Sequence, residues 1–444
     1  MNTIVLGGGI SGLAFAHALL QGGTPMDQLV LLEAAPRLGG LIETLSVDGF
    51  QLERGPETFV DDGTLLDGLV QELGLCDEIQ RPPQDAKLRW LAHKGRLEAL
   101  PMGPGGLLGT PILSFGAKLR LFGEPFVRRG TDPREDFASF ISRRFGPQIL
   151  DRLADPFASG VYAGVPEKME TQACFPKLFE AEQRFGSVLR GARKVGMKPG
   201  KIFSFTRGNS QLVHALQEAL GPCVHDNFRA VSLDRKASTY RVRAEDGRTF
   251  EAQRLALALP AIPASRLLQT LSPSLATLTG SIPFVSVSSV HLAFNETDLP
   301  QQIRGFGFLI PRKEARNQIL GVLYSSRLFP SRAPKGKVLL RALLGGARNP
   351  GIESQSDKAL VQQVRDTLSS LTGLSAEPCL VEVSHRPKAL PLYQPGHSEK
   401  LQALAEAQKN FPGLELLGLS YLRSSVAGCV REARRLARRI LSSA

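Results

Sequence analysis

Three glycines follow the first apolar stretch of the chain with the spacing G-x-G-x-x-G. Residues 3–6 predict a short buried strand, Gly7, Gly9 and Gly12 come next, and an apolar helix follows them. In this order the glycines permit a tight turn, a close approach of the backbone to a pyrophosphate, and close packing of the helix on the strand. The helix would also direct its free N–H groups and its positive dipole end toward the phosphates. The stretch therefore predicts a dinucleotide site.

An acidic residue ends the next predicted strand, about twenty residues on, where a ribose hydroxyl would need an acceptor. This residue is Glu33, and Arg37, Gly39 and Gly40 complete the pattern E-x-x-x-R-x-G-G. A nicotinamide dehydrogenase does not need this continuation, whereas a flavoprotein with a long, bound FAD does. Gly39 and Gly40 would let the backbone pass close to the flavin end, and Arg37 could meet phosphate. The combined pattern predicts FAD.

The next stretch, FQLERGPETF at residues 50–59, predicts a strand that runs into a glycine-proline turn. Together these motifs resemble the amine-oxidase-like flavoprotein superfamily, which holds FAD noncovalently or through a cysteine. The resemblance implies an α/β fold with a Rossmann-like FAD-binding domain, an antiparallel-sheet substrate domain and a mainly helical insertion. We expect the FAD domain at residues 1–80, 203–260 and 412–444, the substrate domain at 81–93 and 261–411, and the helical domain at 94–202.

Local patterns agree with this division. Tyr240, Val242 and Ala244 alternate up to a turn at Asp246-Gly247, which predicts a hairpin. A helix that begins near Val426 would present its N-terminal N–H groups to a reduced flavin. The stretches VSVSSVHLAF, LGVLYSS, VLLRALLGG and CLVEVSHRP predict the strands of the substrate sheet.

Several longer stretches sharpen the resemblance. They are GFGFLIP (305–311), LGVLYSSRLFP (320–330), LLGGARNPG (343–351), PLYQPGHSEKL (391–401) and CFPKLFEAEQRFGSVLRG (174–191). These resemble the protoporphyrinogen oxidase family, and the similarity extends over essentially the whole chain. The resemblance implies oxidation of protoporphyrinogen IX to protoporphyrin IX in haem synthesis. Six electrons would pass through FAD to molecular oxygen, with release of hydrogen peroxide and without a catalytic nucleophile.

The family's substrate is a flexible tetrapyrrole with propionate carboxylates, and the resemblance assigns residues to it. Arg89 stands where the family binds a propionate, and a planar guanidinium suits a carboxylate through paired hydrogen bonds. Phe306, Leu309 and Leu343 would line the pocket, and Gly160 would lie close to the ring. A surface arginine and ordinary core residues remain the alternatives, because strand residues of these types commonly have those roles.

The resemblance also assigns the cofactor residues. At the pyrophosphate it places Gly7, Gly9, Ser11 and Gly12, at the ribose Glu33, and next along the cofactor Arg37, Gly39 and Gly40; near the flavin it places Gly55, Pro56, Glu57 and Val426, and at the adenine Val231. Tyr393 and His397 are interpreted as structural. Ala427 and Gly428 depart from the family's Asn-Asp pair, which removes a side-chain cap from the last helix. Leu419 stands where a polar residue is common.

Composition restricts the cellular compartment, the metal content and the kinds of partner that the sequence favours. The chain has 444 residues, a formal net charge of +12 and five cysteines without a C-x-x-C pair. Scattered cysteines indicate reduced thiols in the cytoplasm, and we predict no metal site. Much of the positive charge lies in the last helix, where the arginines are expected to form the solvent-exposed face. Without a nucleic-acid motif, acidic small molecules or anionic lipid are better partners than nucleic acid.

One segment suggests contact with a membrane. The chain is uncharged from Leu100 to Ala117, is interrupted by glycine and proline, and becomes basic at Lys118, Arg120, Arg128 and Arg129. Such a segment could rest peripherally on the anionic inner face of the cell membrane, or it could be a buried loop with a solvated flank. No apolar run reaches eighteen residues, so we expect no membrane-spanning helix. The sequence also leaves open whether the protein forms a homodimer.

The alternative functions require different residues around the flavin and the substrate. A coproporphyrinogen III oxidase performs the same oxidation on a four-propionate substrate and would need more cations around the pocket. A flavin amine oxidase would use an aromatic cage beside the flavin, but the chain has one tryptophan and five tyrosines, and none forms a fitting C-terminal pair. A carotenoid desaturase would have no use for Arg89. A flavin-binding scaffold without turnover would consume no oxygen.

Overall fold

A five-stranded parallel sheet forms one half of the protein. The computed structural model describes residues 2–61, 63, 66–101, 103–196, 200–315, 318–421 and 425–442. The sheet has the order β10-β2-β1-β14-β20, and every neighbouring pair in it is parallel. Its strands are β1 (Thr3–Leu6), β2 (Leu29–Leu32), β10 (Val224–His225), β14 (Arg254–Leu257) and β20 (Leu414–Leu416). The predicted strand at residues 3–6 is confirmed, and it is buried on both faces, as a parallel strand must be.

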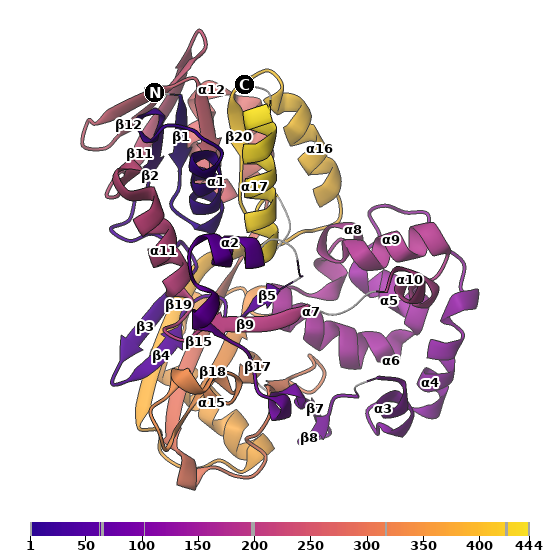
Figure 1. The fold of residues 1–444 in the computed structure, drawn as a ribbon. Coiled ribbons are helices and arrows are strands. Elements are labelled where there is room, and N and C mark those ends of the chain that lie inside the picture. Colours follow the sequence, from indigo (N-terminus) through magenta and orange to yellow (C-terminus); the bar gives the residue numbers. More distant parts are fainter. Residues whose placement is uncertain are drawn as a thin grey trace.

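Helices cover one face of this sheet, and a small second sheet covers the other. The helical layer consists of α1 (Ile10–Gln21), α11 (Ser210–Leu220) and α17 (Val426–Ser442), whose apolar residues share one core with β1 and β2. The opposite face packs on the antiparallel sheet of β11 (Ala230–Lys236), β12 (Thr239–Ala244) and β13 (Thr249–Ala252), together with α12 (Ala261–Leu271) and α13 (Pro273–Gly280). Figure 1 shows α1 and α17 side by side in this half.

A seven-stranded sheet forms the second half, with the order β19-β15-β18-β17-β16-β7-β8. Its strands are β7 (Arg89–His93), β8 (Arg96–Ala99), β15 (Phe284–Asn295), β16 (Gly307–Leu309), β17 (Ile319–Leu323), β18 (Lys337–Gly345) and β19 (Leu380–Pro391). Helix α15 (Asp357–Thr372) covers one face of this sheet (Figure 1), and the apolar residues of that face form a core with it. On the opposite face, Leu339 packs on Phe50 and Leu52, and Leu91 packs on the helical insertion.

This sheet departs from the expected antiparallel sheet in two respects. The pair β16 and β7 is parallel, because β7 enters the sheet from a distant part of the chain. The sheet also continues beyond residue 93, since β8 pairs with β7 inside the segment expected to be helical. The turn between them is Lys94-Gly95, with φ of +52° and +76°, and positive φ at both positions suits a two-residue hairpin.

Short strands connect the two halves. A hairpin of β3 (Thr44–Val47) and β4 (Phe50–Glu53) precedes β5 (Phe59–Asp61), which pairs with β9 (Lys201–Phe205), and β9 also pairs with β6 (Ile79–Gln80). Helix α2 (Leu66–Glu72) follows β5, whereas α16 (His397–Gln408) packs on α13 beside the parallel sheet. Strand β5 packs on α17, so the segment after β4 lies between the parallel sheet and the seven-stranded sheet.

The insertion between β8 and β9 is built from short helices (Figure 1). They are α3 (Gly103–Gly109), α4 (Phe115–Phe122), α5 (Phe137–Phe145), α6 (Pro147–Ile149), a π-helical turn (Leu150–Ala154), α7 (Asp155–Tyr162), α8 (Thr171–Cys174), α9 (Pro176–Phe185) and α10 (Val188–Val195). No helix in the described part of the chain is long and apolar enough to cross a membrane. The boundaries that the sequence predicts for the three domains stay a proposal.

The last helix differs from expectation at one arginine. Arg435, Arg438 and Arg439 are exposed, but the side chain of Arg434 is only 11% exposed and forms an ion pair of 2.5 Å with Glu72 of α2. The prediction of a solvent-exposed face is therefore wrong for Arg434. Periodicity alone could not reveal this contact, because Glu72 lies on another helix far away in sequence.

Candidate functional site

The glycine turn between β1 and α1 forms an anion cradle. Gly7 has φ of +114°, and a Cβ atom there would lie 2.5 Å from the carbonyl oxygen of Ala258. A Cβ atom at Gly12 would lie 2.0 Å from the carbonyl oxygen of Gly7, so both positions require glycine. Gly9, the N-cap of α1, is different: a Cβ atom there would meet no described atom within 4 Å, and none of the described side chains caps the helix. The open space at this helix start fits a pyrophosphate.

Glu33 lies beside the cradle at the end of β2. Its Oε2 accepts a hydrogen bond from the backbone N–H of Gly8 at 2.7 Å, and its Oε1 accepts one from Ala35 at 2.8 Å. A carboxylate oxygen can accept more than one hydrogen bond, so these contacts orient the side chain without exhausting it. The backbone of Glu33 also bonds to His225 and Phe228, which brings the segment before Val231 to this edge. Val231 itself is the bulged residue of β11 and is half exposed.

Arg37 organises the loop that follows Glu33. Its guanidinium donates hydrogen bonds to the carbonyl oxygens of Leu38, Gly40 and Ile42 at 2.8–3.3 Å and lies 3.3 Å from Glu43. Gly39 and Gly40 in this loop have positive φ, and the Gly39 N–H donates to the carbonyl oxygen of Gly8. The loop is thus held beside the glycine turn. In this geometry Arg37 holds the backbone, and its contact with phosphate stays a prediction.

Three predicted flavin-end residues, Gly55, Pro56 and Glu57, form one segment between β4 and β5. The backbone of Gly55 packs so closely on the Gly40 loop that a Cβ atom would lie 1.8 Å from the carbonyl oxygen of Leu41. Pro56 follows, and its carbonyl oxygen accepts a hydrogen bond from Asn209 at 2.7 Å. Glu57 is buried and leads into β5, which packs on α17.

The beginnings of α1 and α17 lie together. Cys429, in the first turns of α17, forms a side-chain hydrogen bond with Ser11 in the first turn of α1. Burial raises the pKa of the Cys429 thiol, although the hydrogen bond from Ser11 opposes this shift. Val426 begins α17, and the three residues 422–424 before Ser425 lie outside the described part of the chain. Both helix starts therefore point at one region of the site.

Strand register brings three predicted substrate residues together on the sheet face opposite α15. Leu343 of β18, Gly321 of β17, Leu309 of β16 and Leu91 of β7 form one cross-strand row. Helix α7 lies against this row, since a Cβ atom at Gly160 would lie 2.7 Å from Cδ2 of Leu309. Gly160, Leu309 and Leu343 thus line one apolar surface, as a planar ring would require.

Arg89 occupies the next row on the same face, beside Gly307. Its guanidinium carbon lies 4.7 Å from the ring centre of Phe306, and none of the carboxylates in the described residues pairs with it. Partial burial lowers the pKa of Arg89, which stays above the physiological range. Phe306 packs with Ala86, Leu328 and Phe329 rather than with Leu309, so the structure places it beside Arg89 and away from the apolar row.

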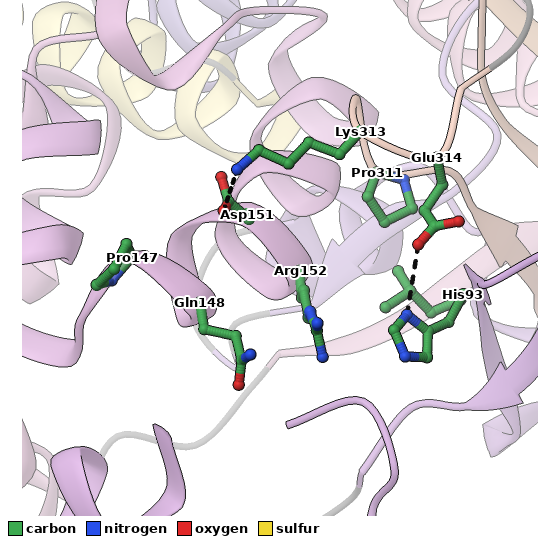
Figure 2. Close-up of a pocket in the computed structure, with 9 residues that line it drawn as sticks. His93, Pro147, Gln148, Asp151, Arg152, Pro311, Lys313 and Glu314 are labelled. Atoms are coloured by element: carbon green, nitrogen blue, oxygen red, sulfur yellow. Dashed lines mark hydrogen bonds and ion pairs between the residues drawn. The ribbon is translucent and has the colours of Figure 1, made fainter. Parts of the chain in front are cut away.

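A cavity of about 310 Å³ lies at the other end of this face. Figure 2 shows Gln148 and Arg152 extending from the helical insertion toward the same space as His93. Leu91 of the apolar row also lines it. Lys313 is neutralised by Asp151 at 2.5 Å, and His93 lies 3.5 Å from Glu314, whereas Arg152 has no carboxylate partner among the described residues.

Sequence analysis missed a buried polar layer between the two halves. It contains Glu53, Asn209, His291, Arg332 and Arg341, all at most 5% exposed. Arg332 pairs with Glu53, and Arg341 lies 3.2 Å from Glu57. Burial and the nearby Arg341 charge hold the pKa of His291 well below its usual value, so its ring is neutral. The only local signal was the charged run ERGPE at residues 53–57.

Tyr393 and His397, interpreted as structural from the sequence, pack against each other. The Tyr393 hydroxyl donates a hydrogen bond to the carbonyl oxygen of Leu419 at 2.5 Å, and the two rings lie 4.5 Å apart. Burial lowers the pKa of His397 to about 4, with help from Lys400. Both residues line a second cavity of about 420 Å³ beside α8, α9 and α16.

Comparison with known proteins identifies the relatives of this chain. Residues 10–441 match the family of flavin-containing amine oxidoreductases. A protoporphyrinogen oxidase from Bos taurus is 34% identical, over 100% of this chain and 98% of the relative. A coproporphyrinogen III oxidase from Bacillus subtilis (strain 168) is 27% identical, over 98% and 96%. A crystal structure from Exiguobacterium sp. 255-15, assigned as a protoporphyrinogen oxidase, superposes with a TM-score of 0.86 and 26% identity, over 100% and 99%.

Proposed function

Because this chain belongs to the family of flavin-containing amine oxidoreductases, we propose that it oxidises protoporphyrinogen IX to protoporphyrin IX with molecular oxygen as acceptor. The observation that carries this proposal is the apolar row of Leu309 and Leu343 with Arg89, which has no carboxylate partner among the described residues, in the adjacent row. That arrangement suits a macrocycle with carboxylates at one edge. The full-length similarity to the bovine protoporphyrinogen oxidase supports the same substrate.

The bound flavin would supply the acceptor for hydride, and the residues of this chain would position both partners. The cradle at Gly9 would hold the pyrophosphate, and Glu33 would bind the ribose. Arg89 would pair with a propionate through charge-assisted hydrogen bonds. Gly160 leaves space in front of Leu309 where any side chain would have to displace it, so a flat ring could approach the sheet.

We propose that FAD is held noncovalently. The buried thiol of Cys429 points to Ser11 at the predicted pyrophosphate end, and its raised pKa disfavours the thiolate that an attachment would need. Cys174 and Cys223 are also buried, and burial raises the pKa of both. Acid denaturation should release all flavin into the supernatant. Yellow colour retained in the precipitate would contradict noncovalent binding.

The substrate assignment is tested by porphyrin fluorescence during aerobic turnover of protoporphyrinogen IX and coproporphyrinogen III in parallel. Arg89→Ala should raise KM for protoporphyrinogen about ten- to hundred-fold with unchanged flavin content, because one charge-assisted contact is worth roughly 1.5–3 kcal/mol. Arg96→Ala is the matched control, since Arg96 lies on the same hairpin, is 70% exposed and pairs only with Glu98. Equal KM values for both variants would remove Arg89 from the site.

Coproporphyrinogen III is the second candidate substrate, and a specific observation favours it. Arg152 has no carboxylate partner among the described residues, and it lines a cavity with Leu91 and His93, on the other side of Leu91 from Arg89 along β7. A four-propionate substrate would need such a cation away from Arg89. Preference for coproporphyrinogen, abolished in Arg152→Met, would establish that alternative, whereas faster oxidation of protoporphyrinogen would support the main proposal.

We also propose peripheral contact with an anionic membrane through α3, α4 and the turn after them. Phe115, Leu119 and Phe122 recur on one face of α4, and they are 81%, 62% and 61% exposed. Phe126 in the following turn is 86% exposed, and Leu108 of α3 is 59% exposed. Figure 1 places α3 and α4 at the end of the molecule away from the parallel sheet. Large aromatic side chains grouped at an exposed edge are typical of an interaction surface.

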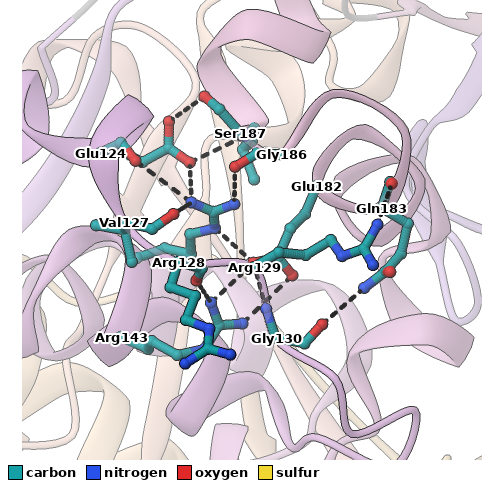
Figure 3. Close-up of polar contacts among 12 residues, drawn as sticks. Glu124, Val127, Arg128, Arg129, Gly130, Arg143, Glu182, Gln183, Gly186 and Ser187 are labelled. Carbon is teal, nitrogen blue, oxygen red and sulfur yellow. Dashed lines mark hydrogen bonds and ion pairs between the residues drawn. The ribbon is translucent and has the colours of Figure 1, made fainter.

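Nearby positive charges and an anchored backbone support contact of this segment with a lipid surface. The flanking cations are Lys118, Arg120, Arg128 and Arg129, and none has a carboxylate partner among the described residues. The turn that carries Phe126 is anchored by buried Arg144, whose guanidinium donates to the carbonyl oxygens of Glu124 and Val127, two residues labelled in Figure 3. The aromatic surface is therefore presented on a fixed backbone.

Flotation with phosphatidylglycerol–phosphatidylcholine vesicles tests this contact. The protein should float with vesicles that contain phosphatidylglycerol, and Phe115→Ser combined with Phe122→Ser should abolish flotation. Val195→Ser is the control, because Val195 is 59% exposed elsewhere in the same insertion. Flotation of all three proteins to the same extent would contradict the proposed surface.

A further inference from the structure

The segment at residues 53–57 carries three charged residues, and each pairs with the substrate sheet or its flanking loops. The pairs are Glu53 with Arg332, Arg54 with Glu382, and Glu57 with Arg341. They differ in burial: the side chains of Arg54 and Glu382 are 28% and 27% exposed, whereas those of Glu57 and Arg341 are 6% and 5% exposed. The Glu57–Arg341 pair is therefore shielded from solvent.

The carboxylate of this buried pair has fewer hydrogen bonds than the carboxylate of its neighbour. Glu53 accepts hydrogen bonds from Arg332, from the Thr44 hydroxyl at 3.0 Å and from the backbone N–H of Asn209 at 2.8 Å. Among the described residues, the Glu57 carboxylate accepts one hydrogen bond, from Nη1 of Arg341 at 3.2 Å. Its other oxygen is buried without a hydrogen-bond partner in the described part of the chain. A buried carboxylate oxygen usually has a partner, so this atom indicates a place where a further group binds.

The pair lies between the predicted substrate surface and the predicted flavin end. Arg341 is two residues before Leu343 on β18, so both side chains lie on the same face of the sheet. Glu57 is two residues after Gly55, whose backbone packs on the loop of Gly40 and Leu41. The strand that follows Glu57 packs on α17, the helix that begins at Val426. A flavin ring held by these elements would have the pair beside it.

We propose that Glu57 and Arg341 form a positioning pair that sets the reduction potential of the bound flavin. This inference rests on the flavin binding that underlies the proposed function. Charges in a water-excluded site act strongly on a neighbouring group. The positive charge of Arg341 favours the more electron-rich reduced flavin, and the negative charge of Glu57 opposes it. The two charges balance in the native protein, so removal of either must shift the potential in a predictable direction.

The experiment measures the two-electron midpoint potential of the purified holoenzyme by dye-equilibrated reduction, without porphyrinogen. Arg341→Met should lower the potential and Glu57→Gln should raise it, each by a tenfold change in the reduction equilibrium, which is about 30 mV. The double variant should return to within threefold of the native equilibrium. Arg54→Met is the matched control and should leave the potential unchanged, because its pair is partly exposed to solvent.

Each outcome has a distinct meaning. Shifts of the two single variants in the same direction, or no shift at full flavin content, would overturn the proposed pair. If Arg341→Met does not fold, Arg341→Lys with and without Glu57→Gln replaces it, and the Glu57→Gln shift must again be positive. Failure to oxidise porphyrinogens would refute the proposed substrate and leave these potentials measurable. A native protein that binds no flavin would refute both proposals, and its absorbance spectrum would show this directly.

Discussion

Two buried arginine–glutamate clusters in this protein differ in how completely their carboxylates are hydrogen-bonded. In the helical insertion, Arg144, Glu124 and Glu182 are fully buried, and Arg144 lies 3.1 Å from Glu124 and 2.7 Å from Glu182. Glu124 also accepts hydrogen bonds from the Ser187 hydroxyl and from the backbone N–H of Val188. By contrast, Glu57 and Arg341 share one hydrogen bond.

The two clusters differ because they connect different parts of the molecule. Arg144 joins α5 to the turn after α4 and to the loop before α10, and its hydrogen bonds to described residues fix backbone within the helical insertion. Glu57 and Arg341 come from the segment after β4 and from β18, and they lie near the predicted flavin end. A closed cluster stabilises the fold, whereas an open one leaves donors and acceptors for a ligand.

The largest expected effect is at the closed cluster. Arg144→Met should lower the free energy of unfolding by about 3–5 kcal/mol, because it leaves the buried charges of Glu124 and Glu182 uncompensated. Urea denaturation followed by circular dichroism measures this loss. Addition of Glu124→Gln should not restore stability, since Arg144 also holds the carbonyl oxygens of Val127 and Gly186. Full recovery in the double variant would show that the cluster is a simple pair.

The open cluster of Glu57 and Arg341 should behave as a simple ion pair. Arg341→Met and Glu57→Gln should each destabilise the apoprotein by about 3 kcal/mol, whereas the double variant should recover most of this loss, because both buried charges are then absent. The same denaturation experiment gives the coupling energy. Additive losses in the double variant would mean that the two side chains contribute independently, and the contrast with Arg144 would then disappear.

A smaller effect is expected at the partly exposed pair of Arg434 and Glu72. Arg434→Ala should cost at most about 1 kcal/mol at neutral pH, since the Glu72 side chain is 33% exposed. The hydrogen bond from Arg434 lowers the pKa of Glu72, although burial opposes it. The stabilisation is therefore present above the unfolded pKa of about 4.5 and is lost as pH falls through the lower folded value.

Denaturation at pH 7 and pH 3 tests this dependence. The difference in stability between the native protein and Arg434→Ala should shrink at the lower pH, because protonation of Glu72 removes the charge that pairs with Arg434. Arg435→Ala is the control, since Arg435 is 80% exposed on the same helix. A difference that grows on acidification would contradict the sign.

The smallest effect is expected at His397. Burial lowers its pKa to about 4, so its ring is neutral between pH 6 and 9 and cannot produce an inflection there. His397→Gln should therefore leave the shape of the pH profile of kcat/KM unchanged over that range. Between pH 6.5 and about 4 the unfolded state binds a proton that the folded state does not, so the native protein should lose stability as pH falls through this window. A lost inflection between pH 6 and 9 would give His397 a role in turnover.

Much of the nucleotide-binding half could be predicted because its signals are local. Gly12 is required by its contact with Gly7 in the same strand–turn–helix unit, the turn gives Gly7 a positive φ, and Glu33 ends the neighbouring strand. The start of α17 near Val426 was likewise predicted from periodicity and is confirmed. Each of these depends on backbone geometry over a few residues, which sequence spacing encodes directly.

The substrate face could be predicted only in part, because it depends on strand register. Leu309 and Leu343 meet across Gly321, whereas Phe306 lies outside the apolar row with Leu328 and Phe329. A shift of one residue along a strand exchanges its two faces, so a resemblance in residue types does not determine which face a side chain occupies. The parallel pairing of β7 with β16 had no local signal either.

By itself, the sequence determined the cofactor cradle, the order of the strands along the chain and the family resemblance, since short-range spacing and residue type carry that information. Only the tertiary structure decided that Glu57 meets Arg341, that Arg434 meets Glu72, and that Gly160 faces Leu309. These contacts join residues more than a hundred positions apart. Long-range packing of separately formed elements brings them together, and no local pattern in either partner specifies the other.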